Sequence, residues 1–95
     1  MTVFLFPTEM EAELFMELCP DADVVISGVG MAATAATISK LYAERRLGSD
    51  CVVLLAGLAG SYVGGLEKGD VVEVVEECCA ELPERFQPVY EPDRC

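Results

Sequence analysis

Short apolar runs that alternate with helical segments restrict most strongly how this chain can fold. The runs Thr2–Phe6, Val24–Ile26 and Cys51–Ala56 are continuously apolar and short, as buried strands are. Between them, Glu9–Leu18 spaces its apolar residues as a helix does, and Met31–Leu47 follows a glycine turn as a second helix. This order predicts an α/β fold, with a mostly parallel, twisted sheet and helices flanking it.

The sequence after the third run predicts one more strand and then an irregular tail. Asp70–Glu76 alternates imperfectly between valines and acidic residues, which indicates a strand with one buried face. Beyond Leu82, repeated prolines and acidic residues argue against regular structure. The chain has 95 residues, which suits one domain. We therefore predict a folded body over residues 1–82 and a proline-rich acidic tail over residues 83–95.

Charge and cysteine content restrict the partners and the compartment. Six basic and 17 acidic residues give a net charge of −11, which repels phosphate backbones and anionic membranes. We therefore expect neither nucleic acid nor a membrane as partner. The five cysteines are an odd number and no secretion signal precedes the first strand, so reduced thiols in the cytoplasm are expected. The chain has no histidine, and we expect no metal and no cofactor.

The turns that follow the three apolar runs are the candidate site. In open parallel sheets, ligands bind in the crevice beyond the carboxyl ends of the strands. The turns Pro7–Glu11, Ser27–Met31 and Gly57–Ser61 should meet at that end of the sheet. We therefore expect a binding site formed by these turns.

Motifs in the same turns resemble a known family. They are P-T-E-M-E-A at residues 7–12, S-G-V-G-M-A-A-T at 27–34, A-G-L-A-G-S at 56–61 and L-E-K-G-D-V-V at 66–72. In this order and spacing they resemble the nucleosidase branch of the nucleoside phosphorylase superfamily, over residues 2–82. The first two motifs are most similar to futalosine hydrolases, and next to methylthioadenosine/S-adenosylhomocysteine nucleosidases. The resemblance implies a nucleoside phosphorylase/hydrolase-like fold and a purine nucleoside as substrate.

The resemblance also implies roles for particular residues. The family's catalytic glutamate, which orients or activates the attacking water, falls on Glu11. A carboxylate suits this task because it accepts a proton from water and stabilises nearby positive charge. The resemblance places the substrate against the three turns, where glycines let a flat ring approach the backbone. The implied substrate-binding residues are Thr8, Gly28, Gly30, Leu58, Ala59 and Gly60.

Two leucines favour water over phosphate as the nucleophile. Phosphorylases of this superfamily hold phosphate with an arginine and a serine that fall on Leu55 and Leu58. Leucine offers no charge-assisted donor to an oxyanion, and no lysine or arginine precedes residue 40. The expected reaction is therefore hydrolysis of an N-glycosidic bond, and the resemblance to futalosine hydrolases implies release of hypoxanthine in menaquinone synthesis.

The resemblance covers less than half of a usual family member, which bears on activity and partners. The aspartate that protonates the purine at N7 and the M-E motif that binds the ribose hydroxyls belong to the C-terminal half of the family fold. We expect the 95-residue chain to be a truncated family member that is inactive alone. The expected macromolecular partner is the missing C-terminal half or a second copy in a homodimer.

Three other interpretations of the same residues stay open. Thr8 and Glu11 have the spacing of a capping box, in which both side chains serve the start of a helix. Gly28, Gly30 and Ala33 fit a dinucleotide-binding fingerprint, although the next strand does not end in the acid that this site uses. The chain could also be a non-catalytic nucleoside-binding or assembly module that pairs through an exposed sheet edge.

Overall fold

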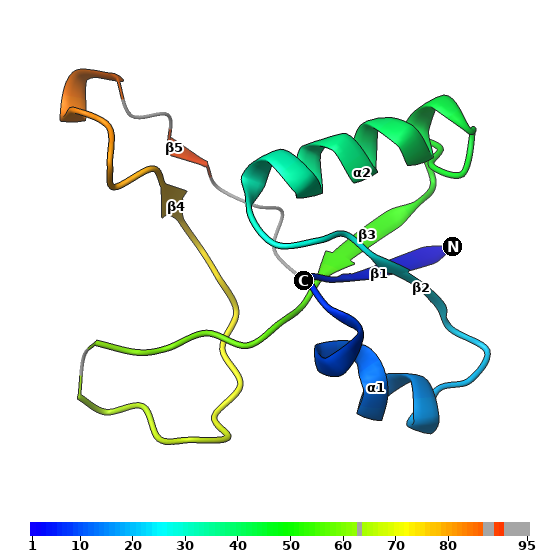
Figure 1. Cartoon of the computed structure of the whole chain (residues 1–95), viewed down its shortest axis with the longest axis horizontal. Coiled ribbons are helices and arrows are strands. Elements are labelled where there is room, and N and C mark those ends of the chain that lie inside the picture. Colours follow the sequence, from blue (N-terminus) through cyan, green and yellow to red (C-terminus); the bar gives the residue numbers. More distant parts are fainter. Residues whose placement is uncertain (63, 87–88, 91–95) are drawn as a thin grey trace. The chain divides into compact units, whose positions relative to one another are not determined.

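The computed structural model describes residues 1–62, 64–86 and 89–90. Its contacts divide the chain into two compact units, Met1–Gly60 and Ser61–Cys95. The first unit alternates strands and helices as the sequence predicts (Figure 1). Its elements are β1 (Thr2–Phe6), α1 (Glu9–Leu18), β2 (Asp23–Ile26), α2 (Met31–Ala43) and β3 (Val52–Leu55).

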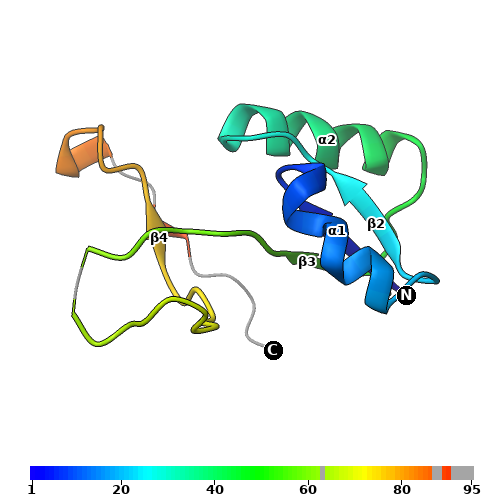
Figure 2. The same ribbon diagram turned by 60° about the horizontal axis from the view of Figure 1, so that its bottom comes forward.

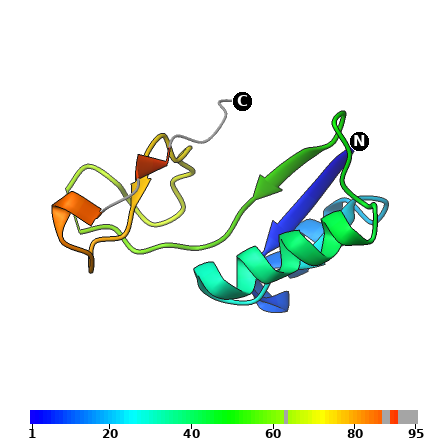
Figure 3. The same ribbon diagram turned by 90° about the horizontal axis from the view of Figure 1, so that it is seen from above.

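The strands of the first unit form a parallel sheet in the order β2-β1-β3. In the register, Val3 lies opposite Asp23 on one side and Val53 on the other. Figure 3 shows β1 and β3 side by side and pointing the same way. The predicted α/β class is confirmed as a small unit with three parallel strands flanked by helices.

The central strand β1 supplies the buried side chains for both faces of the sheet. Successive side chains of a strand point to opposite faces. Val3 and Leu5 are fully buried and form a cluster with Leu41 of α2. On the other face, Phe4 and Phe6 lie 4.6 and 5.4 Å from the ring of Phe15 in α1, measured between ring centroids. The two helices therefore cover opposite faces, as Figure 1 shows.

The end of α2 differs from the prediction. The sequence predicts a helix to Leu47 that stops at Gly48, but α2 ends at Ala43. Arg45 adopts a left-handed φ of 59°, and its N–H donates to the carbonyl of Tyr42 at 3.0 Å. The N–H of Arg46 donates to the carbonyl of Leu41 at 2.9 Å. These bonds form a Schellman motif, which ends the helix before the glycine is reached.

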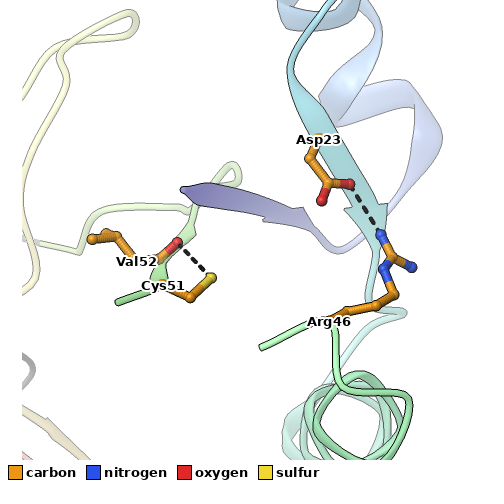
Figure 4. Close-up of polar contacts among 4 residues, drawn as sticks. All are labelled: Asp23, Arg46, Cys51 and Val52. Atoms are coloured by element: carbon orange, nitrogen blue, oxygen red, sulfur yellow. Dashed lines mark hydrogen bonds and ion pairs between the residues drawn. The ribbon is translucent and has the colours of Figure 1, made fainter. Parts of the chain in front are cut away.

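Side-chain contacts hold the segment after α2 against the sheet. The guanidinium of Arg46 lies 3.0 Å from the carboxylate of Asp23 in β2 (Figure 4). Cys51 is partly buried against the core, and its thiol donates to the carbonyl of Val52 at 3.8 Å. The prediction that Cys51 is a small core residue therefore agrees with its position at the edge of the core cluster.

None of the helices in the described part of the chain is long and apolar enough to cross a bilayer.

The second unit contains β4 (Glu77–Cys78), a 3-10 helix (Glu84–Phe86) and β5 (Val89–Tyr90). Its two strands pair antiparallel, with Glu77 opposite Tyr90. The 3-10 helix and β5 lie in the segment that the sequence predicts to be irregular. The division of the chain into a family half-domain and a tail stays a prediction.

The predicted strand Asp70–Glu76 is wrong. These residues have no helix or strand structure, and regular pairing begins only at Glu77. Backbone N–H and C=O groups in a strand need a neighbouring strand as partner, and no described strand pairs with this segment. Its valines are also exposed, Val71 by 97% of its surface. Without a partner strand or a covering layer, a valine-rich sequence does not form a strand.

Candidate functional site

The three candidate turns follow the carboxyl ends of three parallel strands, so they begin at the same end of the sheet. Backbone bonds extend the sheet by one residue beyond β2 and beyond β3. The N–H of Ser27 donates to the carbonyl of Phe6 at 2.9 Å, and the N–H of Ala56 donates to the carbonyl of Leu5, also at 2.9 Å. The turns after β2 and β3 thus flank the turn after β1. The sequence predicts that the three turns share one end of the sheet, but it does not predict this order.

Glu11 joins the first turn to the third. Its Oε1 accepts a hydrogen bond from the backbone N–H of Leu58 at 2.8 Å. Its Oε2 accepts a bond from the hydroxyl of Thr8, also at 2.8 Å. The side chain is half-buried, so part of the carboxylate surface stays open to solvent. One carboxylate therefore connects α1 with the turn that follows β3.

These donors determine the ionisation of Glu11. The backbone N–H of Leu58 and then the hydroxyl of Thr8 hold the pKa of the carboxyl below its ordinary value, and this outweighs the opposing effect of desolvation. The group is therefore a carboxylate at neutral pH. A carboxylate has about four positions that can accept hydrogen bonds. Positions remain for a water molecule or a substrate hydroxyl.

Thr8 has a structural role that the sequence also predicts. It is the N-cap of α1, where its hydroxyl accepts the N–H of Glu11 at 3.3 Å. The capping-box interpretation is thus confirmed on the threonine side. The same glutamate also reaches Leu58, so the cap and the contact between the turns occur together.

Gly57 and Pro7 complete this contact, although neither is among the predicted substrate-binding residues. A Cβ added to Gly57 would lie 3.2 Å from Oε1 of Glu11 and 3.2 Å from Cδ of Pro7. Such distances are tighter than ordinary van der Waals contact. Glycine at this position lets the third turn approach the carboxylate. A glycine directly after an apolar run that predicts a strand is the sequence signal that could have indicated this.

The second turn is constrained by its own backbone. Gly28 and Gly30 have φ values of 82° and 95°, which favour glycine. A Cβ on Gly28 would lie 3.0 Å from the Cβ of Ala33 in α2. The buried hydroxyl of Ser27 donates to the carbonyls of Gly28 at 3.0 Å and Phe6 at 3.4 Å. The glycine pattern therefore serves a tight turn and close packing of α2.

The remaining predicted binding residues lie on the surface. Leu58 is 84% exposed, and Ala59 and Gly60 are also exposed. Leu55, which the sequence resemblance aligns with the phosphate-binding arginine of phosphorylases, is 59% exposed. Two surface hollows lie elsewhere: one follows α2, and the other lies beside α1 and β2. Glu11 lines neither of these two hollows.

Comparisons of the chain with protein-family models, curated proteins and solved structures found no match. The nucleoside phosphorylase-like fold is therefore an expectation, while the small parallel α/β unit is shown. The catalytic role of Glu11 and the substrate-binding roles of the other turn residues stay predictions. Among the described residues, no group of three or more acidic, cysteine or histidine side chains could hold a metal ion.

Proposed function

We propose that this chain supplies the water-activating part of a cytoplasmic purine-nucleoside hydrolase of the futalosine hydrolase type. The observation that supports this is the ionised carboxylate of Glu11, held at the carboxyl end of a parallel sheet by Leu58 and Thr8. Ligand crevices in such sheets lie at this end. The family resemblance independently selects the same glutamate.

The proposed reaction replaces a glycosidic bond with a bond to water. The water oxygen bonds to C1′ of the ribose as the bond from C1′ to the purine nitrogen breaks, and the electron pair of the broken bond stays with the purine. Glu11 orients the water and accepts its proton as positive charge develops on the sugar. The lowered pKa keeps Glu11 ionised, so the carboxylate is available both to accept this proton and to stabilise the positive charge. The proton for N7 of the purine comes from an acid outside these 95 residues.

The exposed leucines support hydrolysis over phosphorolysis. Leu55 ends β3 and Leu58 lies in the third turn, and their side chains carry no donor for a phosphate oxyanion. A nearby carboxylate would also repel phosphate. Water carries no charge, so it can approach the carboxylate without this penalty.

Binding and catalysis can be tested separately. We expect a purine nucleoside at millimolar concentration to shift the amide NMR signals of Gly28, Leu58 and Ala59 in the full chain. We expect no release of base from the chain alone. Adding the separately expressed C-terminal half of a futalosine hydrolase should restore hydrolysis, and Glu11→Gln should then reduce the rate at least about 100-fold. Glu44→Gln removes one carboxylate remote from the turns and is the matched control.

The possible results distinguish a catalytic role of Glu11 from a role in binding alone. Release of hypoxanthine or adenine by the isolated chain would contradict the expectation that an outside acid is required. Equal rates for Glu11→Gln and Glu44→Gln in the restored enzyme would refute the catalytic role of Glu11. Nucleoside binding without hydrolysis in the restored enzyme would identify a binding module.

The outer edge of β3 favours a second candidate, an assembly module. No described strand pairs with this edge, and the exposed residues of β3 are apolar, including Val52, Val53 and Leu55. An unpaired apolar edge is a template for another strand. In this alternative, the function is pairing through β3, and Glu11 only holds the third turn in place.

A further inference from the structure

We infer that the groove between α1 and β2 binds a basic amphipathic helix of a partner protein. This surface lies at the outer edge of the sheet, away from β3, and Figure 2 shows α1 running alongside β2 there. The inference does not depend on the proposed hydrolase activity. The apolar residues that line the groove are Met10, Met16, Val24 and Ile26.

Two methionines make the groove suitable for a helix. Met10 is 78% exposed, and Met16 is also exposed. Methionine is unbranched and polarisable, and surfaces rich in it adapt to apolar helix faces. Helices bind in apolar grooves through residues spaced three or four apart. The groove therefore offers the apolar contact that such a helix needs.

Three glutamates give the groove its charge. Glu9, Glu13 and Glu17 line it and are exposed. Residues four apart in a helix lie one above another, so the three carboxylates form a row about 12 Å long at 1.5 Å per residue. Lysines or arginines four apart on a partner helix have the same spacing. The acidic row thus selects a basic partner.

The acidic row is unfavourable in the free chain. Like charges four residues apart destabilise a helix by about 0.2–0.5 kcal/mol per pair. Glu17 lies in the last turn of α1, where the helix dipole disfavours negative charge and where no basic residue occurs. Among the described residues, no ion pair involves these glutamates. A cationic partner would offset both the repulsion among the three glutamates and the unfavourable interaction of Glu17 with the helix dipole.

A second copy of this chain is a poorer occupant. A symmetric dimer through this groove would bring two identical acidic rows together. Such like-charge contact opposes association. The net charge of −11 adds long-range repulsion between copies and attraction for a basic protein.

The test uses the full chain and a defined peptide. The peptide is an amphipathic helix of about 18 residues, long enough to form in the groove, with a leucine face bordered by lysines four apart. The control peptide carries glutamate in place of lysine. We expect only the lysine peptide to bind, with NMR shifts confined to α1 and β2, and we expect added salt to weaken the binding.

Charge reversal gives the sharper measurement. Glu13→Lys should weaken lysine-peptide binding at least about fivefold, and Met10→Ala should also weaken it, while Glu44→Lys should have little effect. Circular dichroism checks that each variant keeps its helices. Equal binding of both peptides, no binding at millimolar peptide, or equal affinity of Glu13→Lys and Glu44→Lys would overturn the inference. Self-association that Met10→Ala abolishes would show that a second copy occupies the groove, and would overturn it too.

Discussion

The carboxylate of Glu11 receives one hydrogen bond from the cap of its own helix and one from Leu58, 47 positions later in the chain. The nearness of Thr8 and Glu11 that permits the first bond was predictable from their capping-box spacing, although a capping box pairs each side chain with a backbone N–H rather than with the other side chain. The second was not, since the donor is a backbone N–H whose position depends on the pairing of β1 with β3. A sequence motif gives the types of side chain at each position, but it does not indicate which backbone N–H groups will lie near those side chains in the folded chain.

At the residue scale, the Thr8 hydroxyl should control the ionisation of Glu11. Thr8→Val removes a donor that stabilises the carboxylate, so the pKa of Glu11 should rise. A pH titration followed by carboxyl ¹³C NMR measures this directly. A Glu11 pKa that is the same in both proteins would contradict the assigned hydrogen bond.

The lowered pKa of Glu11 also has a consequence for stability. Its pKa is lower in the folded chain than in the unfolded chain, so the unfolded state binds more protons. The stabilisation is therefore present above the ordinary glutamate pKa and is lost as pH falls through the folded value. Glu11→Gln should remove this part of the acid sensitivity.

At the scale of elements, the sequence predicts the start of both helices but the end of only one of them. α1 has its predicted bounds and α2 begins at Met31, since capping and turn residues mark these positions. The end of α2 was missed because an arginine occupies the left-handed position that glycine usually takes. The ion pair of Arg46 with Asp23 belongs to tertiary structure, and the sequence pattern gives no sign of it.

The left-handed conformation of Arg45 predicts a stabilising substitution. Non-glycine residues in this region are strained by about 1–2 kcal/mol. Glycine would remove this strain, but part of the stabilisation would be offset because glycine loses more conformational entropy on folding. Arg45→Gly should therefore raise the free energy of unfolding by about 0.5–1 kcal/mol. Urea denaturation measures the change. Glu44→Gly is the matched control: Glu44 has a φ of −78°, so glycine there should destabilise the chain.

A glycine substitution in the turn before α2 should destabilise the chain, in contrast to Arg45→Gly. Gly28→Ala would impose strain at a φ of 82° and would place a Cβ 3.0 Å from that of Ala33. We expect a loss of about 1–3 kcal/mol in urea denaturation. Gly60→Ala, where nothing lies within 4 Å of the added Cβ, should be nearly neutral. Because part of the loss comes from the contact with Ala33, it should be smaller in an Ala33→Gly background.

At the scale of the whole molecule, an apolar run of the described chain forms a strand only where a neighbouring strand pairs with it. β1 was predictable because both of its faces are covered, by Leu41 on one side and Phe15 on the other. The valines of residues 71–75 have a similar composition but no partner strand, and the predicted strand did not form there. Strand formation depends on pairing and burial more than on intrinsic preference.

The outer edge of β3 predicts concentration-dependent association. Its unpaired backbone groups and exposed apolar residues favour pairing with another strand, whereas the net charge of −11 opposes contact between copies. We expect oligomers to appear in sedimentation velocity as protein and salt concentrations rise, because salt screens the repulsion. Leu55→Lys should shift the chain toward the monomer, since lysine protects strand edges.

A matched substitution separates the β3 edge from general hydrophobicity. Val71→Lys adds the same charge at an exposed residue outside any strand. If association depends on pairing at β3, Leu55→Lys should suppress it more strongly than Val71→Lys does. Equal suppression by both variants would show that net charge alone controls association. A strand that covers β3 would bury Val52, Val53 and Leu55, so slower amide exchange in β3 should accompany the oligomers.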